Sequence, residues 1–215
     1  PFGLPRELVE TLGWPLQWEP LLRHVAALPR AELRTRLAAF CAARPAGSKF
    51  AHRACDGPAG SSPSMKWVNP PVVYMLHTGV PLLLEAGVRL PGLHAGAGDQ
   101  RIALEAYPGL LARELIGRRS YKSDAKVDEA AAQARHAARG ELIDALVAGR
   151  SRLGIRLLLS AAQRRALQGE SSADRLDAVL ALLQAAWASR QPGFGLPPWL
   201  DPLEGWIASA PWDDA

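Results

Sequence analysis

The stretch Arg-Ile-Ala-Leu-Glu-Ala-Tyr-Pro-Gly-Leu-Leu, residues 101–111, decides which fold the sequence predicts. An apolar run at 102–104 precedes Glu105, and Tyr107-Pro108 then turns the chain into a helix, because proline suits the first helical turn. This order is typical of a buried strand followed by a helix. A carboxylate in a buried strand is costly unless it is paired, protonated or bound to a metal. We interpret Glu105 as a metal ligand.

Length and composition indicate an ordinary globular protein. The 215 residues suffice for one sizeable domain, and the 48% hydrophobic and 21% charged residues argue against large-scale disorder. No run of 18 apolar residues and no signal peptide are visible, which predicts no membrane partner. Cys41 and Cys55 are too few for a disulfide framework, so we expect a reduced, cytoplasmic protein.

The modest positive charge permits a nucleic-acid partner without requiring one. The formal net charge is +4, and most of the basic residues are arginines, which suit bidentate phosphate contacts. A chain rich in arginine and alanine can equally reflect genomic base composition. The charge therefore leaves both DNA and RNA open as partners.

Apolar residues recur at helical spacing through most of the chain. Helices are expected over residues 18–28, 31–43, 72–86 with a kink near Pro81, 124–149, 156–167 and 171–190. Strands are expected at 101–107 and, with a weaker pattern, at 203–207. A stable sheet generally needs three or more strands. Either the neighbours of residues 101–107 come from outside this chain, or the segment is no strand and the protein is all-helical.

Residues 44–71 form the least regular segment, which is rich in Gly, Pro and Ser and too long for an ordinary connection. Its basic side chains include Lys49, His52, Arg53 and Lys66. They could contact phosphates, or the segment could simply be a solvated loop.

The densest cluster of basic and aromatic residues is Arg118, Arg119, Tyr121 and Lys122. Arginine and lysine neutralise backbone phosphates, and tyrosine can stack on a base. The pattern predicts a contact with nucleic acid. The alternative is an ordinary surface turn between two helices.

Two carboxylates lie close together at the start of the expected helix over residues 171–190. Asp174 and Asp177 are three residues apart, so they share a helix face, and such a pair repels unless a cation lies between them. Mg²⁺ and Mn²⁺ prefer oxygen ligands of this kind. The alternative is structural, because acidic residues stabilise a first helical turn and Ser171 with Asp174 resembles a capping box.

Five motifs occur in a characteristic order, and together they resemble a known family. They are Pro-Phe-Gly-Leu-Pro at 1–5, Glu-Ala-Tyr-Pro at 105–108, Ser-Tyr-Lys at 120–122, Asp-Arg-Leu-Asp-Ala at 174–178 and Glu-Gly-Trp-Ile at 204–207. The set is similar to largely uncharacterised bacterial and archaeal proteins described as predicted nucleases with an RNase H-like fold. The similarity runs from Pro1 to Ile207.

The resemblance implies an α/β fold with an RNase H-like core, as one domain over residues 1–215. Residues 18–98 would be a mainly helical elaboration, and residues 99–215 the C-terminal part of the core. Glu105, Asp174 and Asp177 would be catalytic and would bind two Mg²⁺ or Mn²⁺ ions for phosphodiester hydrolysis. The protein would then be a hydrolase. The alternative is a nucleic-acid-binding or regulatory module that does not cleave.

The same resemblance places a first-strand Asp, a further Asp and most of the sheet upstream of Pro1. We therefore expect an N-terminally truncated member of the family, with few strands left. Without the first-strand Asp the metal pair lacks a shared ligand, which predicts weak or absent activity in this form.

Overall fold

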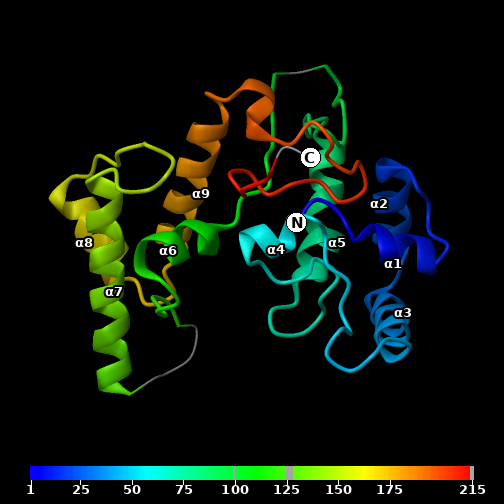
Figure 1. Ribbon diagram of the computed structural model, residues 1–215, viewed down its shortest axis with the longest axis horizontal. Helices are drawn as coiled ribbons and strands as arrows, with labels where there is room; N and C mark the ends of the chain where they lie inside the picture. Colours follow the sequence, from blue (N-terminus) through cyan, green and yellow to red (C-terminus); the bar gives the residue numbers. More distant parts are fainter. Residues whose placement is uncertain (99, 124–127, 214–215) are drawn as a thin grey trace. The chain divides into compact units, whose positions relative to one another are not determined.

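The computed structural model describes residues 1–98, 100–123 and 128–213, and the chain divides into two compact units. Unit 1 comprises residues 1–105 and 193–215, and unit 2 comprises residues 106–192. The helices of unit 1 are α1 (Arg6–Thr11), α2 (Trp18–Ala27), α3 (Arg30–Ala42), α4 (Asp56–Ala59) and α5 (Val72–Glu85). Those of unit 2 are α6 (Pro108–Ile116), α7 (Glu129–Val147), α8 (Ala161–Gly169) and α9 (Asp174–Ala188), as Figure 1 shows. A short 3-10 helix covers Pro192–Gly195.

Unit 1 is built around the packing of α2 on α5. Helix α2 buries Leu21, Leu22 and Val25, whose spacing places them on one face. Helix α5 meets this face although Pro81 interrupts its own backbone hydrogen bonding. A hydrogen bond of 2.9 Å between His77 Nε2 and the Leu28 carbonyl joins the end of α2 to α5.

Unit 2 packs α6 against both α7 and α9, and α7 against α8. Its core contains Leu111 of α6, Leu142 and Leu146 of α7, and Leu180 of α9. Helix α8 begins at a capping box, in which Ser160 Oγ accepts a hydrogen bond from the Gln163 N–H and Gln163 Oε1 accepts one from the Ser160 N–H.

The predicted α/β fold is wrong for the part of the chain that the structure describes. No strand occurs there, and residues 101–107 take part only in isolated bridges, from Ile102 to Arg89 and from Glu105 to Ile207. Ile102 is 41% exposed, so the apolar run is not a buried strand. A single bond from the Ala208 N–H to the Glu105 carbonyl, 2.7 Å long, does not continue into a ladder. The all-helical alternative describes the fold of residues 1–98, 100–123 and 128–213, and these residues show no RNase H-like core.

Some of the predicted helices and strands are confirmed, and others are wrong. The helices near residues 18–28, 31–43 and 72–86 are confirmed, whereas the strand at 203–207 is wrong, since this segment makes turns and one isolated bridge. The capping box at Ser171 is also wrong: α9 begins after Ala173, which has a left-handed backbone and provides no side-chain cap. Residues 124–127 of the helix expected over 124–149 lie outside the described residues.

Candidate nucleic-acid-binding site

Glu105 lies in unit 1, where Arg53 binds it through both carboxylate oxygens. Arg53 Nη2 donates to Oε1 and Nη1 donates to Oε2, each over 2.7 Å, and the Phe2 N–H donates to Oε2 over 2.8 Å. Burial opposes ionisation, but the Arg53 charge and the hydrogen bonds from Arg53 and the Phe2 N–H outweigh it and lower the pKa of Glu105 to about 2. Glu105 is therefore an ionised partner in a bidentate ion pair.

Arg53 is the centre of a wider buried network. Its side chain is 2% exposed, and it also donates to Asp56 Oδ1 over 3.0 Å and to the Glu204 carbonyl over 3.2 Å. Burial disfavours the guanidinium charge, yet the neighbouring Glu105 raises the pKa of Arg53 well above its ordinary value. The suggestion that Arg53 contacts phosphates is wrong, because water and ligands do not reach it.

Glu204, the first residue of the Glu-Gly-Trp-Ile motif, fixes two other segments of unit 1. Its Oε1 accepts a 2.8 Å bond from the Arg6 N–H at the start of α1, and its Oε2 accepts a 2.7 Å bond from the Ala54 N–H. A carboxylate at a helix N-terminus satisfies a free N–H and meets the positive end of the helix dipole. This motif therefore has a structural role in unit 1.

Asp174 and Asp177 lie in unit 2, in the first turn of α9. Asp174 is exposed. Asp177 is 19% exposed at its side chain and receives two bonds, from the Tyr121 hydroxyl at 2.6 Å and from Lys122 Nζ at 2.5 Å. Burial and the neighbouring Asp177 carboxylate raise the pKa of Tyr121. The structure thus brings together Tyr121, Lys122 and Asp177, which the sequence selected for two separate reasons, whereas no contact joins Asp174 to them.

The basic cluster at 118–122 is largely engaged with acidic residues. Arg119 forms a two-pronged pair with Glu141, at 2.9 and 2.5 Å, and Lys122 pairs with Asp177. Arg118 is exposed. Exposed pairs of this kind are weak and exchange readily with other ions. A nucleic-acid contact at this cluster stays a prediction.

The carboxylates do not form a complete metal site within the described residues. No group of three or more Asp, Glu, His or Cys side chains is placed to hold a metal ion there. Glu105 belongs to unit 1, whereas Asp174 and Asp177 belong to unit 2. Metal binding by these residues, and the Mg²⁺ or Mn²⁺ that it would require, therefore stays a prediction.

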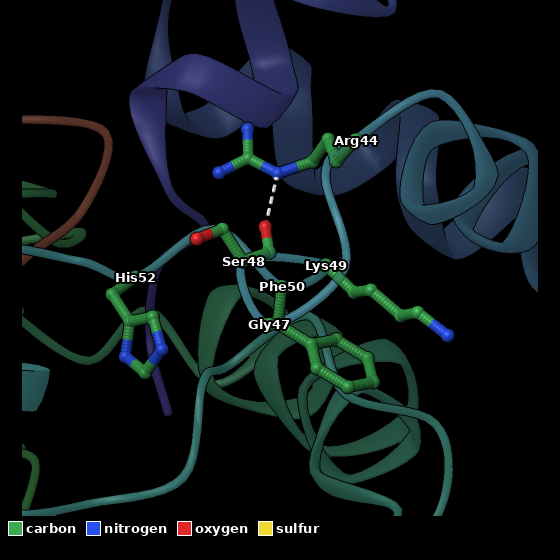
Figure 2. A pocket seen from close by; sticks show the side chains of 6 residues that line it. All are labelled: Arg44, Gly47, Ser48, Lys49, Phe50 and His52. Carbon is green, nitrogen blue, oxygen red and sulfur yellow. Dashed lines mark hydrogen bonds between the residues drawn. The ribbon is translucent and has the colours of Figure 1, made fainter.

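A hollow on unit 1 offers a different kind of site. It has a volume of about 430 Å³, and its lining residues are Arg44, Gly47, Ser48, Lys49, Phe50 and His52. Lys49 and His52 are exposed, and Figure 2 shows the Phe50 ring between their side chains. The lining contains Arg44, Lys49 and the His52 imidazole and no carboxylate, which suits an anionic ligand.

The chain between α3 and the hollow is shaped by a turn and by Arg44. The Ser48 N–H bonds to the Pro45 carbonyl over 3.1 Å, and Gly47 has a φ of +93°, which side chains other than glycine rarely adopt. Arg44 Nε donates to the Ser48 carbonyl over 2.7 Å (Figure 2), and its guanidinium pairs with Glu7. Arg44 therefore holds the loop, and Lys49 and His52 are left as the exposed basic groups of the hollow.

The sequence singled out the segment that lines this hollow, but it did not show which of its basic side chains are exposed. The order Lys49-Phe50-Ala51-His52 already places an aromatic residue between two basic ones, which is a usable signal for nucleic-acid contact. The spacing could not show that Arg53, next in the chain, turns inward to Glu105.

Comparisons of the chain with protein families, with curated proteins and with solved structures find no match. Among the described residues, no helix has both the length and the apolar character needed to cross a membrane.

Proposed function

We propose that this protein binds nucleic acid, and that the hollow at residues 44–52 contacts the phosphate backbone. The observation that carries the proposal is the lining of the hollow, where Lys49 and His52 are exposed on either side of Phe50 and no carboxylate lies among the lining residues. A lysine ammonium neutralises phosphate and releases the counterions that surround a nucleic acid, and a histidine ring can hydrogen-bond to a phosphate oxygen.

Two further features support a polyanionic partner. Lys66 Nζ, which bonds to the Asn69 carbonyl over 2.6 Å, lies 5.9 Å from the centre of the Phe50 ring and extends the positive region along the loop. The whole chain has an excess of four positive charges. Such a field raises the rate at which an anionic polymer encounters the surface.

The test is the salt dependence of binding to a fluorescein-labelled oligonucleotide, followed by anisotropy. Lys49→Ala should weaken binding and lower the slope of log affinity against log salt by about one. Arg34→Ala is the matched control, because Arg34 is exposed on α3 outside the hollow and its loss changes the net charge equally. Equal effects of the two substitutions would exclude the hollow as the binding site.

Metal-dependent hydrolysis of nucleic acid is the second candidate function. The observation that favours it is the convergence of Lys122 and Tyr121 on Asp177, one turn along α9 from Asp174. A lysine and a tyrosine beside paired carboxylates could bind a phosphate and hold its charge near a metal. The ordered motifs that include these residues point to the same activity.

Cleavage is tested with the protein and a labelled oligonucleotide in Mg²⁺ or Mn²⁺. Asp177→Asn should abolish cleavage and keep binding at the hollow. Glu105→Gln tests the predicted third ligand, and its folding must be checked by circular dichroism, because Arg53 loses its partner. Cleavage that persists in both variants would exclude these carboxylates. Binding without cleavage in the unmodified protein would leave the binding module as the function.

A further inference from the structure

Phosphate binding alone does not explain why the aromatic side chain of Phe50 lines the hollow. Its ring is half-buried and lines the hollow beside two exposed basic side chains. Trp67 packs edge-on against it, with the ring centres 5.6 Å apart. This contact and the nearby Lys66 ammonium hold the ring in place, so the hollow has a fixed aromatic surface as well as a positive charge.

The size of the hollow limits what can occupy it. Its volume of about 430 Å³ is that of a site for a small organic group, far below what a double helix would need. Arg44 is committed to Glu7 and to the loop, so Lys49 remains as the exposed permanent cation of the lining, enough for about one phosphate. A flat apolar wall beside a phosphate-sized positive region matches one nucleotide unit.

We infer that the hollow takes one nucleotide of a single strand, with its base against Phe50 and its phosphate beside Lys49. The inference rests on the proposed function and names its substrate class. The two faces of a base in a duplex are covered by its neighbours, whereas a single strand can turn a base outward onto an aromatic ring. The surface therefore selects single strands over duplexes.

The experiment compares a labelled 12-nucleotide oligo(dT) with a duplex of the same length, by anisotropy at two salt concentrations. The single strand should bind at least tenfold more tightly to the unmodified protein. Phe50→Leu should weaken single-strand binding about tenfold with an unchanged salt slope, because stacking carries no charge. Lys49→Ala should weaken binding and lower that slope, and Lys49→Arg should restore both. Arg34→Ala should preserve the preference for single strands.

The outcomes separate the inference from the proposed function. If Lys49→Ala weakens binding but Phe50→Leu does not, the hollow binds phosphate and the stacked base is excluded. If duplex and single strand bind equally, selection for single strands is excluded, while phosphate binding stands. If neither strand binds, both proposals fail. Phe50→Ala, with its thermal unfolding measured alongside, repeats the test with a different packing change at the Trp67 contact.

Discussion

Arg53 retains its charge in a part of unit 1 that water does not reach, because two carboxylates accept its hydrogen bonds. The pair with Glu105 is bidentate, with both bonds 2.7 Å long, and Asp56 completes the arrangement at 3.0 Å. A buried pair of this kind adds little net stability by itself, but the removal of one partner leaves the other charged and unsolvated. The charged, buried state of Arg53 therefore depends on Glu105 and Asp56, and theirs depends on Arg53.

Glu105→Gln should accordingly destabilise the fold by about 3–5 kcal/mol, because Arg53 would remain buried without its counter-charge. Urea denaturation followed by circular dichroism measures the change in the free energy of unfolding. Glu141→Gln is a matched control, since Glu141 forms an exposed pair with Arg119 and its loss should leave stability unchanged. An unchanged stability in Glu105→Gln, together with lost metal binding, would instead support the metal-ligand hypothesis.

At the scale of single elements, the starts of α8 and α9 differ in whether a serine side chain caps the helix. Ser160→Ala should cost about 1 kcal/mol, because it removes the hydroxyl that accepts the Gln163 N–H. Ser171→Ala should have almost no effect, because α9 begins after Ala173 without a side-chain cap. Chemical denaturation of both variants checks this, and an equal loss in the two would contradict the observed helix starts.

The connection between the first residues and the segment near 203 gives a second prediction at this scale. A Cβ at Gly3 would lie 2.3 Å from the carbonyl oxygens of Leu203 and Glu204, which are backbone atoms and cannot move aside cheaply. Gly3→Ala should therefore destabilise the protein by about 1–3 kcal/mol or more. Gly57→Ala, where nothing lies within 4 Å of the added atom, is the control. Thermal unfolding of the two variants checks this: the midpoint should fall in Gly3→Ala and stay close to that of the unmodified protein in Gly57→Ala.

Helices were predictable from the sequence because their signals are local. The spacing of Leu21, Leu22 and Val25 shows one buried face within two turns. The partner of Glu105 is 52 residues away in the sequence, so no local pattern could distinguish an ion pair from a metal ligand. An apolar run of three residues before Glu105 is likewise too short to separate a strand from an irregular segment with isolated bridges.

For the whole molecule, the lowered pKa of Glu105 predicts that the protein loses stability in acid. Its pKa is about 2 in the folded protein and 4.5 without the fold, so the folded state holds the ionised form more strongly. The stabilisation is fully present above pH 4.5 and is lost as the pH falls toward 2, by about 3 kcal/mol in total. Unfolding free energies measured from pH 6 to 2 should show this fall, and Glu105→Gln should show a smaller one.

Unit 1 is discontinuous in the sequence, and this has a consequence for its synthesis. Leu4 N–H, Arg53 Nη1 and the Glu105 carbonyl all bond to residues 203–208, so these bonds cannot form until residues 203–208 have been synthesised. Contacts that close loops this long are slow to form, and N-terminal segments usually fold first during translation. Here the continuous unit 2 can fold on the ribosome before unit 1 is complete. Residues 1–105 would meanwhile expose part of their apolar core, which makes them a target for chaperones that bind nascent chains.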